Sequence, residues 1–148
     1  MAGVRGLSGS ECKEAVARVI ETCFLEKVAR QSIGTLSKGY RHRTCLAQSL
    51  IHDPEVLILD EPTDGLDPLQ KHEVRTLIKE MAQTKAIIIS THILEEVEAV
   101  CSRAIIIAQG KMVIDSTPEA LLSQYAEYGN LDGIFRHLIG TTGNFRRN

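Results

Sequence analysis

The sequence lacks any long run of apolar residues, and this absence excludes two kinds of segment. Its longest purely apolar runs are about five residues, such as 104–108, and its first twenty residues carry charges at Glu11, Lys13, Glu14 and Arg18. A transmembrane helix needs about 20 predominantly apolar residues, and a signal peptide needs a shorter but continuous apolar segment. We therefore expect neither, so that any contact with a membrane is made through another protein.

The sequence also lacks an excess of charge of one sign, and it lacks closely spaced cysteines. Lys and Arg number 17 and Asp and Glu 19, a net charge of -2, so no bulk attraction to nucleic acid or anionic lipid is present and no nucleic-acid partner is expected. Cys-x-x-Cys and metal-ligand spacings are absent, which indicates reduced thiols in a cytosolic protein and small core residues. The four cysteines are Cys12, Cys23, Cys45 and Cys101.

The length and the apolar content suit one α/β domain. At 148 residues, of which 43% are hydrophobic, the chain can bury one sizeable core but is too short for two ordinary domains. Two short apolar runs, 56–59 and 86–89, indicate strands, and the first of them is expected to be buried on both faces. A helical pattern that begins at Asp67 and Pro68 separates them. A crossover of this length makes the two strands parallel by the right-handed rule.

Amphipathic helices are predicted on both sides of this strand–helix–strand unit. One follows residues 8–10, a second spans 40–51, and another follows residues 90–92. The last of these helices buries its apolar side and is expected to turn three glutamates toward solvent, namely Glu95, Glu96 and Glu98.

A β-hairpin and two further helices are predicted beyond these elements. The segments 103–108 and 111–115 flank Gln109-Gly110, which is a pattern typical of a hairpin with a two-residue turn. Residues 117–119 then open a short helix, and Asn130 caps a last amphipathic helix.

Two carboxylates stand at the end of the first strand. Asp60 and Glu61 follow that strand directly, and ligands bind at the carboxyl ends of the strands in open α/β sheets. One acid there can hold a metal while the second acts on a water, which favours a phosphate-and-magnesium site. The alternative is that Asp60 caps the turn made by Pro62 and Gly65. His92, which follows the second parallel strand, is expected at the same edge.

A second candidate site lies at the N-terminus of the predicted helix 40–51. Ser37, Lys38 and Gly39 precede this helix. A helix N-terminus presents free N–H groups and about half a positive charge, and a glycine there lets a phosphate approach the backbone. Lys38 and Arg41 add positive charge. The alternative is that Ser37 is an ordinary N-cap residue.

Together these motifs resemble those of the ATP-binding subunit of ABC transporters. Residues 36–40 look like the family's signature motif, 56–61 like its Walker B strand with the catalytic glutamate, and 65–67 like its D-loop. His92 looks like its switch histidine. Four motifs in the right order make the resemblance specific, and the details around the signature and the histidine look most like gliding-motility and drug-export ABC ATPases.

The resemblance implies an ATPase that uses ATP and Mg²⁺. Asp60 would hold Mg²⁺ through water, Glu61 would orient and deprotonate the attacking water, and His92 would contact the γ-phosphate. Asp67 would couple the two halves of a dimer. The signature residues would bind the γ-phosphate of the nucleotide held by the opposite subunit; they are Ser37, Lys38 and Gly39.

The sequence contains no P-loop, the Gly-x-x-x-x-Gly-Lys-[Ser/Thr] motif that carries most of the grip on a triphosphate. The nearest approach is 34–40, in which Tyr40 takes the position of the lysine. We therefore expect an α/β, P-loop-NTPase-like fragment, the C-terminal half of an ABC ATPase, which is inactive alone and needs a P-loop from another chain. Two alternatives stay open: a non-hydrolysing piece or remnant that docks on an intact ABC subunit, and part of a DNA-associated ABC-fold ATPase.

The resemblance also suggests an organisation and a location. Residues 1–54 would form part of the helical subdomain with the signature motif, 55–128 the C-terminal part of the ATPase core, and 129–148 a C-terminal helix and tail. The expected partners are another ABC ATPase subunit, in a homo- or heterodimer, and a membrane-spanning permease. Through the permease, the protein would lie in the cytoplasm at the inner face of the cell membrane.

Overall fold

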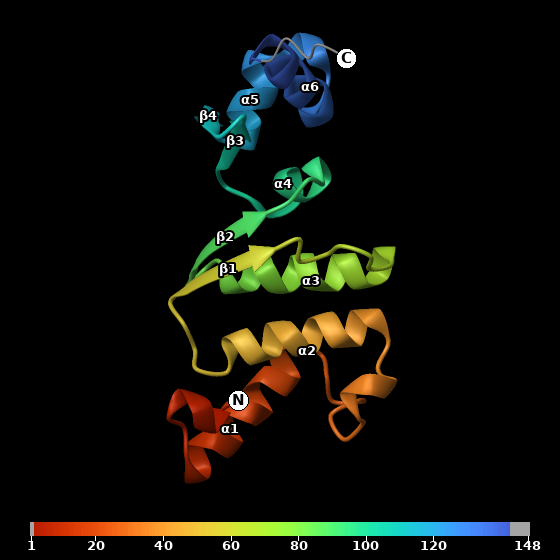
Figure 1. Ribbon diagram of the computed structural model, residues 1–148, viewed down its shortest axis with the longest axis vertical. Coiled ribbons are helices and arrows are strands. Elements are labelled where there is room, and N and C mark those ends of the chain that lie inside the picture. The colour runs from red at the N-terminus through yellow and green to blue at the C-terminus, as the bar shows by residue number, and fades with distance from the viewer. Residues whose placement is uncertain (1, 143–148) are drawn as a thin grey trace. The chain divides into compact units, whose positions relative to one another are not determined.

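The computed structural model describes residues 2–142, which form six α-helices and four β-strands (Figure 1). This confirms the expected α/β architecture. The chain divides into two compact units, residues 1–90 and residues 91–148. The expected domain boundaries after residues 54 and 128 stay predictions. None of the helices within the described range has the length and apolar character that crossing a bilayer requires.

The first unit begins with a pair of packed helices. After the 3₁₀ helix η1 (Ala2–Arg5), α1 (Gly9–Thr22) packs against α2 (Lys38–Leu50), and η2 (Ile33–Thr35) lies in the connection between them. Apolar residues recur at helical spacing on both helices, so that each buries one stripe. The buried side chains of the pair and its connection include Ala15, Val19, Leu25, Val28, Leu36, Ala47, Leu50 and Ile51.

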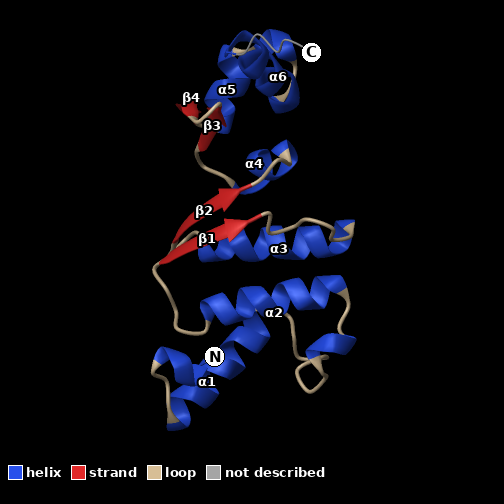
Figure 2. Cartoon of the chain, in the orientation of Figure 1, coloured by secondary structure: helices blue, strands red, loops and turns tan. Residues whose placement is uncertain are grey.

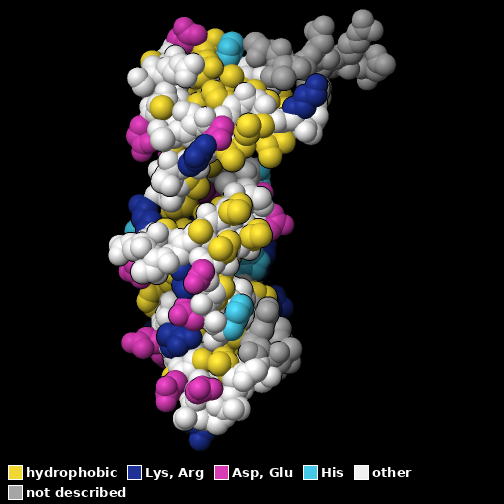
Figure 3. All heavy atoms as spheres, turned by 90° about the vertical axis from the view of Figure 1, so that its left-hand side faces the viewer, with side chains coloured by type: hydrophobic (Ala, Val, Ile, Leu, Met, Phe, Trp, Pro, Cys, Tyr) yellow, Lys and Arg dark blue, Asp and Glu magenta, His cyan; other side chains and the backbone are white. Residues whose placement is uncertain are grey.

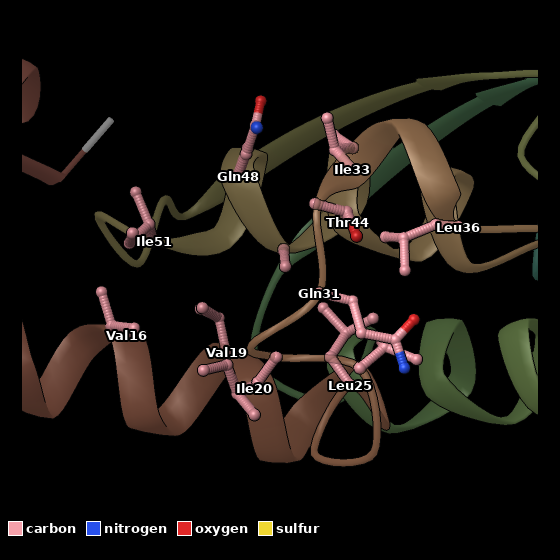
Figure 4. A pocket seen from close by; sticks show the side chains of 13 residues that line it. Val16, Val19, Ile20, Leu25, Gln31, Ile33, Leu36, Thr44, Gln48 and Ile51 are labelled. Atoms are coloured by element: carbon pink, nitrogen blue, oxygen red, sulfur yellow. The ribbon is translucent and has the colours of Figure 1, made fainter.

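A cavity of about 190 Å³ lies between α1 and α2 (Figure 4). Val16, Val19 and Ile20 line it from α1, Thr44 and Gln48 line it from α2, and Ile51 lines it just after α2. Its described lining holds no charged side chain. A phosphate would gain nothing in such an environment, so the cavity reflects the packing of the helix pair and is not a nucleotide site.

A parallel pair of strands forms the centre of the first unit. β1 (Val56–Asp60) and β2 (Ala86–Ser90) run side by side and are joined through α3 (Pro68–Met81) (Figures 1 and 2). Their register pairs each residue from Val56↔Ala86 to Asp60↔Ser90, which confirms the predicted parallel arrangement. The inward side chains of β1 and the apolar stripe of α3 are buried; they are Leu57 and Leu59, with Val74, Leu77, Ile78 and Met81.

The prediction that the first strand is buried on both faces is wrong. Val56 is 56% exposed, Ile58 is 76% exposed and Ile88 is 59% exposed, whereas the alternate residues Leu57 and Leu59 are buried. No described element of the first unit buries the outward set. A continuous apolar run predicts burial on both faces, but the sequence of the strand does not contain the layers that would have to cover it.

This outward apolar face predicts that the 148-residue chain associates with itself. Large contiguous apolar patches are rare on monomeric proteins, and an uncovered strand pair also presents open edges. Replacing Ile58 by Lys should weaken self-association by about tenfold or more, because one large aliphatic side chain no longer leaves water. Sedimentation velocity over a range of concentrations measures the change.

The matched control for this experiment is Leu69→Lys, which places the same charge at an apolar side chain on α3 that is 69% exposed. This variant should self-associate as the parent chain does. A clean monomer with a sharply cooperative thermal transition, or equal effects of the two substitutions, would show that the sheet face is not the associating surface.

The second unit is built on an antiparallel hairpin. β3 (Ala104–Ala108) pairs with β4 (Lys111–Ser116), which confirms the predicted hairpin. The two turn residues, Gln109 and Gly110, have φ values of 52° and 71°. Positive φ at both positions gives the turn whose twist matches two antiparallel strands. Arg103 donates to Asp115 at 2.6 Å beside this hairpin, and that hydrogen bond lowers the pKa of the Asp115 carboxyl.

The described part of the second unit also contains four helical segments, which supply the residues of its core. They are α4 (Leu94–Val100), α5 (Pro118–Gln124), η3 (Ala126–Tyr128) and α6 (Leu131–Thr142). The side chain of Asn130 accepts from the N–H of Gly133 at 2.9 Å, which confirms the predicted cap of the last helix. The predicted tail beyond residue 142 lies outside the described residues. The buried core of this unit consists of Leu121, Leu131, Ile134 and Leu138.

The prediction that all four cysteines are core residues is wrong for Cys45. Cys23 is fully buried, and burial raises the pKa of its thiol to about 11. Cys12 and Cys101 are half-buried, whereas Cys45 is exposed, and all four thiols are free. Cys45 lies two residues from each of the buried positions 43 and 47 of α2, which places it on the opposite side of the helix.

The prediction that Glu96 faces solvent is also wrong, because only 2% of this residue is exposed. Glu96 lies three residues after Ile93 and next to Val97, so it shares the inner side of the short helix α4. Glu95 and Glu98 are exposed, as predicted.

Candidate functional site

The carboxyl ends of β1 and β2 meet at the edge where the sequence predicts a site. Asp60 is paired with Ser90 in the register of the sheet, and the Ser90 hydroxyl donates a short hydrogen bond to the Asp60 carboxylate. Both residues are exposed. The pairing therefore holds a carboxylate and a hydroxyl side by side at a solvent-accessible edge, with the orientation of the carboxylate fixed by its neighbour.

Glu61 turns the chain as it leaves β1. Its φ is 45°, in the left-handed region that residues with a side chain seldom adopt. Its N–H donates to the Ser90 carbonyl at 2.9 Å, and its own carbonyl accepts from the N–H of Asp64 at 3.1 Å. Unusual backbone conformations of this kind persist where the surrounding hydrogen bonds hold them, and they cluster at functional sites. Backbone hydrogen bonds on both sides of Glu61 thus fix the direction in which its half-buried side chain leaves the chain.

Ser37 is the N-cap of α2, and its side chain accepts from the N–H of Tyr40 at 3.3 Å. Ser37 thus caps α2, and the predicted position of residues 37–39 at a helix N-terminus is confirmed, whereas phosphate binding by these residues stays a prediction. Lys38 lies 3.5 Å from Asp64, and both side chains are more than half exposed. A surface pair of this kind is weak, so the Lys38 ammonium can exchange Asp64 for another anion at little cost.

Two glycines let the start of α2 and the loop after β1 approach closely. A Cβ atom at Gly39 would lie 2.2 Å from Gln70 Oε1, and one at Gly65 would lie 1.8 Å from Lys38 Nζ. Gly65 also has a φ of +63°. Neither contact leaves room for a larger residue without displacing a polar side chain. Glycine at both positions is what permits this arrangement.

Asp67 is the N-cap of α3 and belongs to the same region. Its side chain accepts from the N–H of Gln70 at 2.9 Å, and Pro68 occupies the first helical position. Because Gln70 packs on Gly39, the predicted signature residues and Asp67 share one surface of the first unit. Two helix N-termini, each with its positive end exposed, therefore border this surface.

Arg43 fixes α2 against α3 beneath that surface, and sequence reasoning did not identify it. Its guanidinium is 3.0 Å from the Glu73 carboxylate and lies over the Tyr40 ring at 4.6 Å. Only 6% of Arg43 is exposed. Removing Glu73 would leave the buried Arg43 guanidinium without this counter-charge. Arg43 also borders a cavity of about 300 Å³ that Asp60 and Ile58 line from β1.

His92 lies in the other compact unit, within the segment that leads from β2 into α4. Thr91 Oγ1 donates to Glu96 Oε2 at 3.0 Å and accepts from the N–H of Ile93 at 3.1 Å. The predicted approach of His92 to Asp60 and Glu61 stays a prediction.

The oxygen atoms at the sheet edge suit a hard cation. Magnesium prefers carboxylate, hydroxyl and water oxygens and keeps several waters when bound to protein. Asp60 and Ser90 offer such oxygens on one exposed edge. Among the described residues, no three His, Cys, Asp or Glu side chains converge on a metal position. The edge therefore fits a magnesium ion held by few protein groups and completed by water and phosphate.

Several residues of this region carry no sequence signal of their own. Ser90 could have been found by extending the parallel register from the first strand to the second. The contacts that Gln70, Asp64 and Arg43 make depend on how two helices and a loop pack, and no local pattern predicts them.

Comparison with known proteins shows that the chain is similar to ATP-binding proteins of ABC transporters. The family model described as "ABC transporter" matches residues 5–64. The Nod factor export ATP-binding protein I of Paraburkholderia xenovorans is 37% identical over 119 residues, which are 80% of this chain and 39% of that protein. The uncharacterized ABC transporter ATP-binding protein YxlF of Bacillus subtilis is 38% identical over 107 residues, 72% of this chain and 36% of that protein. The chain thus spans about two fifths of the length of these curated relatives.

Solved structures of ABC transporter proteins have the same fold as this chain. The ATP binding subunit of an ABC transporter superposes with a TM-score of 0.76 at 28% identity, covering 93% of this chain and 58% of that one. The cbiO1 protein of Clostridium perfringens, part of the ABC transporter complex cbiONQ, gives a TM-score of 0.72 at 27% identity, covering 82% of this chain and 49% of that one. The resemblance expected from the sequence motifs is confirmed.

Proposed function

The chain belongs to the family of ABC transporter ATP-binding proteins, and from this premise we propose that it forms part of a subunit that binds and hydrolyses ATP to drive transport. It contributes the signature residues, the Walker B strand, the D-loop and the switch histidine. A P-loop is not among these 148 residues and has to be supplied in addition to them. The names of the curated relatives, which are ATP-binding proteins of transporters, support this assignment.

One observation carries the proposal: the N-terminus of α2 and the loop that precedes α3 meet through two glycine contacts. Gly39 packs against Gln70, and Gly65 packs against Lys38. A helix N-terminus with its positive dipole end, beside a weakly paired lysine, is suited to a phosphate group that displaces the side chains now covering Gly39 and Gly65. Ser37, Lys38 and Gly39 are proposed to bind the γ-phosphate of ATP held by the opposite subunit.

The proposed chemistry at the sheet edge divides between two carboxylates. Asp60, oriented by Ser90, holds Mg²⁺ through water. Glu61, fixed in its left-handed turn, orients and deprotonates the attacking water. His92 contacts the γ-phosphate, and Asp67 couples the two halves of the dimer. When bound, Mg²⁺ neutralises charge on the β- and γ-phosphates.

The proposed partners follow from the same family. A second ABC ATPase subunit, identical or different, completes the nucleotide site. The second partner is a membrane-spanning permease. By binding it from the cytoplasm, the protein would lie at the inner face of the membrane. In the competing proposal the chain docks on an intact ABC subunit without taking part in hydrolysis.

The 148-residue chain alone should bind ATP–Mg²⁺ weakly, with a dissociation constant well above the micromolar range. The P-loop amides and the P-loop lysine make most of the binding contacts to a triphosphate, and this sequence contains neither. In addition, the carboxylates of Asp60 and Glu61 repel the phosphates. Calorimetric titration with ATP tests this expectation.

The same titration, repeated with a polypeptide that carries the P-loop half, tests the proposed function. Binding and hydrolysis should appear in the mixture and be absent from each half alone. Micromolar affinity in the isolated chain would contradict the first expectation. A mixture that binds ATP but never hydrolyses it would favour the docking role.

A further inference from the structure

The segment that carries His92 is held by a buried carboxylate. Glu96 lies in the first turn of α4 and is 2% exposed. Its Oε2 accepts from Thr91 Oγ1 at 3.0 Å, and the same Thr91 oxygen accepts from the N–H of Ile93 at 3.1 Å. The N–H of Glu96 donates to the Ile93 carbonyl at 3.0 Å. Three hydrogen bonds therefore tie down the residues on either side of His92.

Stability alone does not explain a carboxylate at this buried position. Burying an ionisable group costs free energy unless its polar atoms are satisfied. The second oxygen, Oε1, has no hydrogen-bond partner among the described residues. The neighbouring positions of α4 carry Leu94 and Val97, which pack against the core of the second unit. An apolar side chain at position 96 would fill the same space without the cost of desolvation.

We propose that Glu96 is a positioning residue for His92 and acts through Thr91. The carboxylate fixes the Thr91 hydroxyl, that hydroxyl fixes the Ile93 amide, and the exposed His92 between them is presented in one direction. Groups that orient an active side chain through such contacts lower the cost of organising a site when ligand binds. The inference rests on the proposed role of His92, but the ordering of the segment can be measured without it.

Hydrogen exchange of the Ile93 amide in the 148-residue chain measures the ordering directly. Glu96→Ala should increase the exchange rate of this amide by about tenfold, because the Thr91 hydroxyl loses its anchor. Glu96→Gln keeps an acceptor oxygen and should exchange as the parent chain does. Thr91→Val should match Glu96→Ala, and Thr91→Ser should restore the protection.

Two further variants separate positioning from a general loss of structure. Glu98→Ala removes an exposed glutamate of the same helix and should leave the exchange rate unchanged. Glu96→Met should keep or raise the thermal transition temperature while the Ile93 amide still loses its protection. If Glu96→Met lowers the transition temperature as much as Glu96→Ala does, or if neither changes the exchange of Ile93, the positioning role is wrong.

The link to catalysis is measured in the mixture with a P-loop half. Glu96→Ala should lower kcat by about tenfold and leave KM for ATP nearly unchanged, with Glu96→Gln restoring the rate, because an orienting contact acts on the reacting geometry. A fall in affinity with unchanged kcat would overturn the proposal. If His92→Ala itself leaves hydrolysis unchanged, the proposed role of His92 fails, whereas the exchange data still decide whether Glu96 orders the segment.

Discussion

Replacing Glu61 by Gln is expected to lower ATP turnover by about two to four orders of magnitude when a P-loop half completes the site, while ATP binding is retained. The substitution removes a general base but keeps the size of the side chain. It should also leave the backbone unchanged, because glutamine and glutamate have the same shape and adopt the φ of 45° at position 61 at a similar cost. Single-turnover hydrolysis and equilibrium ATP binding, measured on the same mixture, separate the two effects.

The control for this substitution is Glu55→Gln, which makes the same chemical change just before β1, at an exposed residue whose backbone carbonyl bonds to the N–H of Ala86. Its turnover should equal that of the parent chain. His92→Ala should behave as Glu61→Gln does. Near-normal hydrolysis in the Glu61→Gln variant would show that another group deprotonates the water.

Replacing Gly39 by Asp is expected to abolish ATP-dependent association with an intact ABC subunit. In the dimer that the proposal implies, the signature residues cap the nucleotide held by the partner, so they function even when this chain lacks a P-loop of its own. A carboxylate at position 39 would add a negative charge beside the proposed γ-phosphate site and would repel the phosphate. The parent chain should form a one-to-one complex in the presence of ATP, detected by sedimentation or size-exclusion chromatography with light scattering.

Controls must separate the added charge from the added volume, because a Cβ atom at Gly39 meets the Gln70 side chain. Gly39→Ala adds the volume alone and should reduce association far less than Gly39→Asp. Gly34→Asp adds the same charge in the preceding loop, where a Cβ atom meets only Ser32 Oγ at 4.0 Å, and should have no effect. Glu61→Gln should leave association unchanged. A complex that survives Gly39→Asp, or no complex with ATP present, would favour a decayed remnant over a capping subunit.

The sequence by itself determined the elements and their order. Hydrophobic periodicity located the helices, apolar runs located β1 and β2, and the Gln109-Gly110 pair located the hairpin turn. Residues such as Ser37, Asp67 and Asn130 marked helix starts, because caps act within three residues of themselves. The crossover rule then made β1 and β2 parallel, so that their carboxyl ends lie at one edge of the sheet. All of these features depend on interactions that are local in the chain or follow from chirality.

Only the tertiary structure decided which surfaces are covered and which polar groups meet. Ile58 reads as a core residue in its apolar run but lies open, because burial depends on layers outside the strand. Glu96 reads as a solvent-facing charge but is buried, because its side of α4 packs toward the core of the second unit. The left-handed turn at Glu61 and the contact between Gly39 and Gln70 likewise arise from packing between segments. Local patterns report the preferences of single elements, whereas a site is made where several of them meet.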